Sequence, residues 1–326
     1  MAEKATSGLE LSATLLPTFP HFNAFVDDPR LGFIRMNSAQ LEGDELNHEL
    51  AEAHRFQDVK PLYFDIKGRQ LRVTKSYPLP DRLELDLNHD VYVETPTTVL
   101  FKGGADGCIL EKVEGNHLVF RGGPEWMVVE GESLHIRHPS LEVGDPIFTE
   151  IEVDKVEKAR KAGFDKFFLS YVEEQRDINL VRELIGDSML MLKIENKKGL
   201  AFVENHFKKE DNLCLVAAMG DLYVEVERPH HILSALKLII GKDSRAVAGS
   251  RMLLSISEEP VPSAADFMQL AWLYEIGYRR MMLCDEICLK EEYFTTAVNV
   301  FDHFRRSYIK VEPPKKKGWL TRILNS

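Results

Sequence analysis

The sequence contains little cysteine and no long apolar run. Only 4 of its 326 residues are cysteine, and none of them forms a CxxC pair or joins a histidine at zinc-site spacing. Buried free thiols are therefore expected, and structural zinc is not. No segment approaches the roughly 20 consecutive apolar residues that a membrane-spanning helix needs, and the first residues lack the apolar core of a secretion signal. These absences predict a cytoplasmic protein with no membrane partner.

Basic residues are also in the minority. The chain has 41 Lys and Arg against 52 Asp and Glu, which gives a formal net charge of -11. This balance argues against nucleic acid or an anionic membrane as the main partner. What the sequence does contain is 44% hydrophobic residues, the content of a globular protein with a full core. Its length suits two ordinary domains or one α/β barrel with an insertion.

Eight strand-like apolar segments recur along the chain, and most are followed by a helical pattern. The strands are expected at 9–15, 31–36, 61–66, 166–171, 188–194, 212–218, 245–249 and 279–283. Helical periodicity occurs at 44–56, 153–162, 175–184, 198–207, 229–240, 264–276 and 291–304. Alternating strands and helices with eight strands predict an α/β fold, a (β/α)₈ TIM barrel, with a doubly wound sheet as the alternative.

The interval between Arg72 and Pro146 breaks this alternation. It holds short alternating runs separated by turns such as Gly103-Gly104 and Gly122-Gly123. This pattern predicts a small β-barrel-like lid domain inserted after the third strand, where it would overhang the active-site face. The expected division is 1–73 for the first part of the barrel, 74–146 for the lid, 147–310 for the second part of the barrel and 311–326 for a C-terminal tail.

Charged and polar residues follow the expected strands, at the end of a barrel where active sites form. Lys193 and Glu195 end the fifth strand with one residue between them, so their side chains point the same way. Asp221 follows the sixth strand. Glu195 and Asp221 are expected to bind Mg²⁺ or Mn²⁺, because hard oxygen ligands from adjacent strands suit these ions. A structural alternative stays open nearby, in which Arg35, Asp65 and Arg72 form salt bridges that close the barrel.

These motifs resemble those of the pyruvate kinase family. The shared segments occur in the same order: Arg35-Met36-Asn37, Asp65-Ile66-Lys67-Gly68 with Arg72, Lys193-Ile194-Glu195-Asn196, Gly220-Asp221-Leu222, Ser250-Arg251 and Cys284-Asp285-Glu286. The resemblance covers about residues 10–307 and is weak in the inserted segment. It implies a barrel interrupted after its third strand by a β lid. It also implies a glycolytic kinase, a transferase that moves phosphoryl from phosphoenolpyruvate to ADP and protonates the enolate to pyruvate.

The resemblance implies catalytic roles for four residues. Arg35 and Arg72 would hold the phosphoryl group, and Lys193 would neutralise its charge during transfer. Ser250 stands where the family has a threonine that serves enolate protonation, and a serine keeps the hydroxyl.

It also implies binding roles. Glu195 and Asp221 would hold the divalent metal ion, and Gly220 and Asp221 would contact the substrate together with the lysine of the fifth strand. Asn37 and Asp65 match positions that hold the family's K⁺. The implied partners are phosphoenolpyruvate or pyruvate and ADP or ATP, and a homo-oligomer is left open.

Several positions depart from the family pattern. Met219 replaces an arginine, Tyr223 replaces a glycine and is expected to crowd the substrate carboxylate, and Ala39 replaces a serine ligand of the cation. The resemblance also ends before the family's C-terminal domain. Two alternatives therefore stay open beside the kinase: a metal-dependent lyase or decarboxylase of a 2-oxo acid, and a non-catalytic homologue that binds a ligand or a partner.

Overall fold

The computed structural model of the chain, which describes residues 8–41, 43 and 45–309, contains a closed barrel of parallel strands. The barrel strands are β1 (Glu10–Thr14), β2 (Leu31–Asn37), β3 (Leu62–Ile66), β12 (Lys166–Leu169), β13 (Met189–Ile194), β14 (Leu213–Ala218), β15 (Val247–Gly249) and β16 (Arg280–Met282). Neighbours in this order pair with one another, and β16 closes the barrel on β1, where Met281 lies opposite Leu11. The predicted eight-stranded barrel is confirmed.

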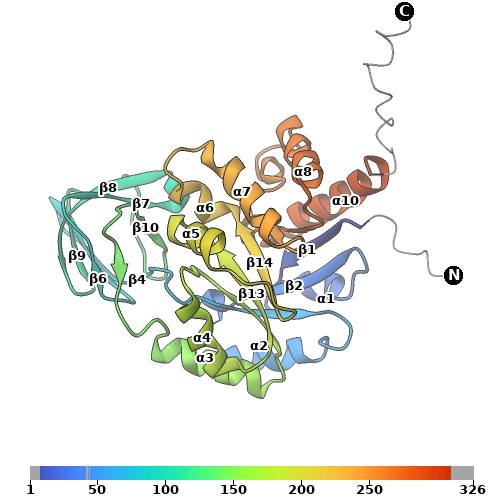
Figure 1. Ribbon diagram of the computed structural model, residues 1–326, viewed down its shortest axis with the longest axis horizontal. Coiled ribbons are helices and arrows are strands. Elements are labelled where there is room, and N and C mark those ends of the chain that lie inside the picture. The colour runs from blue at the N-terminus through green and yellow to red at the C-terminus, as the bar shows by residue number, and fades with distance from the viewer. Residues whose placement is uncertain (1–7, 42, 44, 310–326) are drawn as a thin grey trace, which may run out of the picture.

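Helices surround the barrel (Figure 1). They are α1 (Phe22–Phe25), α2 (Glu45–His54), α3 (Glu150–Lys161), α4 (Gln175–Ile185), α5 (Lys197–Asn205), α6 (Met219–Glu225), α7 (His231–Lys242), α8 (Ala264–Ile276), α9 (Asp285–Cys288) and α10 (Glu291–Ser307). Short 3₁₀ turns η1, η2 and η3 span Ser38–Gln40, Lys102–Gly104 and Leu254–Ser257. The helix α3 begins with a capping box, in which Thr149 and Glu152 each accept the other's backbone N–H.

Apolar side chains fill both sides of the barrel wall. The interior cluster consists of Phe33, Tyr63, Phe168, Met191, Cys214, Val216, Val247 and Met282. A larger cluster lies between the strands and the helices, so that Leu190 and Leu192 face outward while Met191 faces inward. Burial on both faces explains why the segment around β13 is apolar without a break.

The segment between β3 and α3 forms a separate layer of antiparallel strands. They are β4 (Val73–Pro78), β5 (Arg82–Leu87), β6 (Val91–Tyr92), β7 (Thr97–Phe101), β8 (Asp106–Glu114), β9 (His117–Arg121), β10 (Leu134–Ile136) and β11 (Glu142–Val143). Six of them form one sheet in the order β10-β7-β8-β9-β5-β4, and β6 pairs with β11. The sheet curls, because Val73 N donates to Glu132 O and Gly131 N donates to Val73 O, which brings its two edges together.

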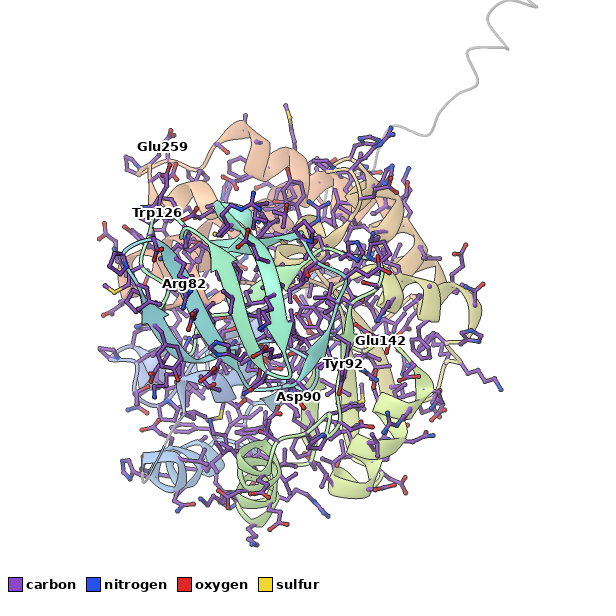
Figure 2. The ribbon with its side chains drawn as sticks, turned by 90° about the vertical axis from the view of Figure 1, so that its left-hand side faces the viewer. Arg82, Asp90, Tyr92, Trp126, Glu142 and Glu259 are labelled. Carbon is purple, nitrogen blue, oxygen red and sulfur yellow. The ribbon has the colours of Figure 1, made fainter. Side chains whose placement is uncertain are left out.

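This lid has its own core and lies at one end of the barrel. Seen from the lid side, its strands stand in front of the barrel, with Tyr92 and Trp126 among its exposed side chains (Figure 2). The predicted β lid after the third strand is thus present. Leu71 and Val73 already pack into the lid core, and the division at residues 73–74 and 146–147 stays a prediction.

Two further expectations concern the described residues. None of their helices is long and apolar enough to cross a membrane. All four cysteines are free, and Cys108, Cys214 and Cys288 are buried. The predicted tail 311–326 lies outside the described residues.

Candidate active site

A buried cluster of charged side chains lies at the C-terminal ends of the barrel strands. Arg35, at the end of β2, donates from Nε to Asp65 Oδ2 over 2.8 Å and from Nη1 to Asp285 Oδ2 over 3.0 Å. Burial opposes the charge of Arg35, but the carboxylates of Asp65 and Asp285 outweigh it and raise its pKa. The Arg35–Asp65 ion pair is one of the salt bridges expected if these residues serve to close the barrel. It also keeps a permanent positive charge at this rim.

Lys67 occupies the place between the two residues that were predicted to hold K⁺. Its Nζ donates to Asn37 Oδ1 over 2.6 Å and to Asp65 Oδ2 over 3.0 Å. Burial lowers the pKa of Lys67 to about 7, an effect that Asp65 opposes and Arg35 reinforces. Ala39 offers no side-chain oxygen. Asn37 Oδ1 and Asp65 Oδ2 already accept hydrogen bonds from Lys67, so these two side chains as they lie do not fit K⁺.

Lys193 and Glu195 lie side by side at the end of β13, as strand alternation predicts. Lys193 Nζ is 3.0 Å from Glu195 Oε1 and donates to Ser170 Oγ over 2.9 Å. Burial opposes protonation of Lys193, but Asp65 and Glu195 outweigh it and raise its pKa. The lysine is therefore held as a cation against the rim.

The two carboxylate oxygens of Glu195 differ in their contacts. Its Oε2 accepts the backbone N–H of Tyr171 over 2.6 Å, whereas Oε1 is buried and has no hydrogen bond within the described part of the chain. The contact of Oε1 with Lys193 is an ion pair that lacks hydrogen-bond geometry. Burial raises the pKa of Glu195 above its ordinary value; the Lys193 ammonium opposes this effect, and the nearby Asp221 carboxylate adds to it.

Asp221 belongs to the first turn of α6, which begins directly after β14. The charge of Asp221 acts on the pKa of Glu195, so the two carboxylates lie near each other, and two carboxylates fit a divalent cation that keeps water or substrate oxygens as its other ligands. No group of three or more His, Cys, Asp and Glu side chains suited to a metal occurs among residues 8–41, 43 and 45–309. The metal would thus be held by two carboxylates.

Gly220 and Ser250 meet at the same rim. A Cβ added to Gly220 would lie 3.5 Å from Ser250 Cβ. Ser250 has a φ of 68°, and Arg251 and Leu253 also have positive φ. Such backbone strain in residues other than glycine is commonly found at functional sites.

Arg72, the second predicted phosphoryl ligand, is bonded elsewhere. Its Nη1 donates to Gly131 O over 2.5 Å, and its Nε donates to Gln70 Oε1 over 3.1 Å. Burial lowers the pKa of Arg72, although Asp65 and Asp221 oppose this. Arg72 therefore lies within the electrostatic reach of the cluster, while its guanidinium is bonded at the base of the lid.

Two side chains that the sequence analysis did not select join the site. His135, on β10 of the lid, is buried, with Nδ1 2.8 Å from Glu225 Oε1 and Nε2 3.5 Å from Asp221 Oδ1. Burial opposes protonation of His135, but Glu225 and Asp221 outweigh it and raise its pKa. The second is Tyr171, whose hydroxyl lies 3.2 Å from His135 Nδ1. At the eighth strand, Asp285 rather than Glu286 contacts the cluster.

Two of the departures from the family pattern face another part of the surface. Met219 and Tyr223 line a pocket of about 540 Å³ between α6, α7, η3 and α8. The Tyr223 ring lies 4.7 Å from the guanidinium of Arg251. The expected crowding of a substrate carboxylate by Tyr223 stays a prediction.

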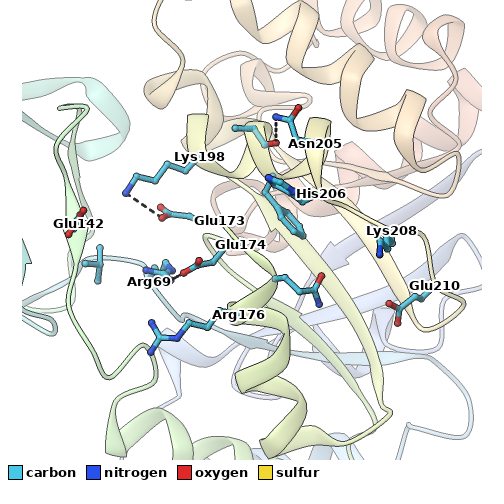
Figure 3. Close-up of a pocket in the computed structure, with 14 residues that line it drawn as sticks. Arg69, Glu142, Glu173, Glu174, Arg176, Lys198, Asn205, His206, Lys208 and Glu210 are labelled. Carbon is cyan, nitrogen blue, oxygen red and sulfur yellow. Dashed lines mark hydrogen bonds and ion pairs between the residues drawn. The ribbon is translucent and has the colours of Figure 1, made fainter.

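A further pocket lies beside the lid connection and not at the cluster. It measures about 1060 Å³ and opens between β11 of the lid and the helices α4 and α5 (Figure 3). Its charged side chains are partly paired with one another: Arg69 bonds Glu174, and Lys198 lies 3.7 Å from Glu173. None of the predicted site residues lines it.

Comparisons with known proteins agree with the fold. The family model described as pyruvate kinase, barrel domain, matches residues 128–298. Pyruvate kinase of Dictyostelium discoideum is 28% identical over 260 residues, which cover 69% of this chain and 50% of that protein. The pyruvate kinase of Methanocaldococcus jannaschii is 23% identical over 228 residues, covering 68% of this chain and 50% of that protein. The chain spans about half the length of the curated relatives it matches.

A solved structure shares the architecture. The crystal structure of Cryptosporidium parvum pyruvate kinase matches with a TM-score of 0.72 and 19% sequence identity, and the match covers 92% of this chain and 70% of that one. At this identity the match demonstrates a common fold.

Proposed function

Because the chain belongs to the pyruvate kinase family, whose barrel-domain model matches more than half of its residues, we propose that it transfers phosphoryl from phosphoenolpyruvate to ADP and protonates the enolate to pyruvate. The observation that carries this proposal is the buried group of Lys193 beside Glu195, with the Asp221 carboxylate next to it. One ammonium and two carboxylates at a barrel rim are the groups that this chemistry needs for positioning and charge neutralisation.

The roles of the residues follow from their charges. Lys193 is a cation aimed at the rim, so it stabilises the negative charge that spreads over the phosphoryl oxygens in the transition state. Arg35 supplies a second fixed positive charge beside it. Glu195 and Asp221 would hold Mg²⁺ or Mn²⁺, and a bound divalent ion supplies charge neutralisation to the enolate and phosphoryl oxygens. The Ser250 hydroxyl is assigned to enolate protonation.

K⁺ has no part in this mechanism, because Lys67 already donates to Asn37 and Asp65. The proposal otherwise keeps the expectations drawn from the resemblance: a place in glycolysis, a cytoplasmic location, and phosphoenolpyruvate, pyruvate, ADP and ATP as small-molecule partners. A homo-oligomer stays an expectation as well.

One observation favours a second candidate, a metal-dependent lyase or decarboxylase of a 2-oxo acid. Arg72, the second predicted phosphoryl ligand, is bonded to Gln70 and Gly131. Enolate chemistry on a 2-oxo acid uses the metal pair but does not need that guanidinium.

A paired assay tests the proposal. Wild-type protein with Mg²⁺, phosphoenolpyruvate and ADP should form ATP, and it should exchange solvent deuterium into the methyl group of pyruvate. Lys193→Met should lower kcat for ATP formation by at least about a hundredfold, the scale of losing one electrostatic stabiliser. Exchange should suffer less, because it moves no phosphoryl group. Lys197→Met, an exposed lysine on the adjoining helix α5, is the matched control and should behave like wild type.

Ser250→Ala should show the reverse pattern, with deuterium exchange reduced more than ATP formation. Wild type without either activity would overturn the proposal in favour of the non-catalytic homologue. Exchange together with oxaloacetate decarboxylation, but without ATP formation, would favour the lyase.

A further inference from the structure

A lid residue reaches the carboxylates of the candidate metal site. His135 of β10 is 2% exposed, and its imidazole lies between Glu225 and Asp221. These two acidic residues are four apart on α6, so they project from the same face of the helix. A single imidazole therefore contacts both, with Nδ1 2.8 Å from Glu225 Oε1 and Nε2 3.5 Å from Asp221 Oδ1.

Tyr171 connects the same imidazole to the other carboxylate of the site. Its hydroxyl lies 3.2 Å from His135 Nδ1, and its backbone N–H donates to Glu195 Oε2 over 2.6 Å. Tyr171 adopts a φ of 51°, a conformation that costs free energy in a residue with a side chain. The contacts thus join Glu195, Tyr171, His135 and Asp221 into one network that includes the lid.

We propose that His135 is a positioning residue whose imidazole contacts Asp221 while no divalent cation is bound. A divalent cation must then displace the imidazole from Asp221 in order to bind. This inference rests on the proposed function, because it takes Asp221 to be a metal ligand. The contact of Nε2 with Asp221 Oδ1 is an ion pair at 3.5 Å, and the imidazole lies beside the carboxylate oxygen that a divalent cation needs. The bond of Nδ1 to Glu225 does not involve Asp221, so it persists when the metal enters and keeps the lid on α6.

The two ring nitrogens can be separated by substitution. His135→Asn places an amide near the position of Nδ1, where it can still bond Glu225, and removes the group that faces Asp221. His135→Ala removes both contacts. Arg137 offers a matched control, because its Nη2 donates to the backbone oxygens of Val226 and Glu227 and so joins the lid to the end of the same helix without touching Asp221.

Two measurements on the whole 326-residue chain test the proposal. Calorimetric titration with Mn²⁺ alone gives the metal affinity, and amide hydrogen exchange of residues 73–143 reports the opening of the lid. His135→Ala should bind Mn²⁺ about threefold tighter, the scale of one partly exposed ion pair, and its lid should exchange faster. His135→Asn should bind Mn²⁺ tighter with little change in lid exchange. Arg137→Ala should exchange faster with an unchanged Mn²⁺ affinity.

Failure of the proposed role of His135 and failure of the metal site give different results. Mn²⁺ binding by wild type that neither His135 variant strengthens would overturn the role of His135 and leave the metal site intact. Absence of Mn²⁺ binding in wild type and in both His135 variants would overturn the metal site and the role of His135 together. Circular dichroism melting of each variant establishes that it is folded before either conclusion is drawn, and the asparagine variant serves if the alanine variant does not fold.

Discussion

At the scale of single residues, Lys67 bears on the expectation that the site binds K⁺. Its Nζ bonds both oxygens that were assigned to K⁺, at 2.6 Å from Asn37 Oδ1 and 3.0 Å from Asp65 Oδ2. Asp65 itself is buried, and the surrounding Arg35, Lys193 and Lys67 charges outweigh the effect of burial and lower its pKa. The acidic side chain is thus neutralised by the protein's own cations.

We therefore expect ATP formation to change less than about twofold when K⁺ is replaced by tetramethylammonium at constant ionic strength. The reason is that Arg35, Lys67 and Lys193 already compensate the buried charge of Asp65. Lys67→Met should make activity dependent on K⁺, because it frees the oxygens of Asn37 and Asp65. Lys60→Met is the matched control: Lys60 is also buried but donates to the backbone oxygens of Asp28 and Leu31. A wild-type protein that requires K⁺ for turnover would contradict this prediction.

The contacts of some site residues could be predicted from the sequence, and those of others could not. The pairing of Lys193 with Glu195 follows from the alternation of a single strand, which is a local property, and it is observed at 3.0 Å. The contact of His135 with Glu225 joins residues 90 apart through the folded lid. No local pattern marks such a contact, because it depends on how the lid strands pair and where the lid rests.

At the scale of elements, local patterns predicted the strands and helices but not how distant strands pair. The apolar periodicity predicted the barrel strands and the longer helices, whereas α6 and α9, with 7 and 4 residues, are too short to show a helical period. The alternation in the lid predicted strands but not their order, since β10 lies beside β7 and β4 beside β5 in a sheet that curls on itself. Pairing between distant strands is set by the whole sheet.

The lid as an element should be dispensable for folding of the barrel. Its core is separate from the barrel's, so replacing residues 74–145 by a short Gly/Ser linker should leave a barrel that melts cooperatively. ATP formation should fall sharply, because a closed lid excludes water from the site. Differential scanning calorimetry and the coupled assay measure the two effects.

The deletion also uncovers Leu71, which packs in the lid core. A second version with Leu71→Ser removes this exposed apolar side chain and controls for aggregation. If both versions are insoluble or melt without cooperativity, the lid strands belong to the folding unit of the barrel, and the predicted division at residues 74–146 is wrong.

At the scale of the whole molecule, polar contacts join the lid to the barrel. His135 and Arg137 connect the lid to α6, His89 Nε2 lies 3.0 Å from Gly68 O, and Arg251 donates to Gly103 O. Apolar packing stabilises each core internally, while such polar bridges contribute about 1 kcal/mol each. Two cooperative units that are weakly coupled are the expected result.

A pair of matched substitutions tests this organisation. Phe168 fills the barrel interior, with its ring centroid 5.9 Å from that of Phe33, and Phe120 fills the lid core, with its ring centroid 5.9 Å from that of Phe101. Both rings are fully buried, so replacing either by alanine should cost about 3–5 kcal/mol of local stability. Phe168→Ala should lower the calorimetric transition of the barrel, and Phe120→Ala should lower that of the lid and leave the barrel transition in place. Tyr92→Ala, on the exposed face of the lid, should change neither transition (Figure 2).

A single transition that both phenylalanine substitutions lower equally would mean that lid and barrel unfold as one unit. The contacts of His135 would then couple the two parts far more strongly than its hydrogen bonds account for.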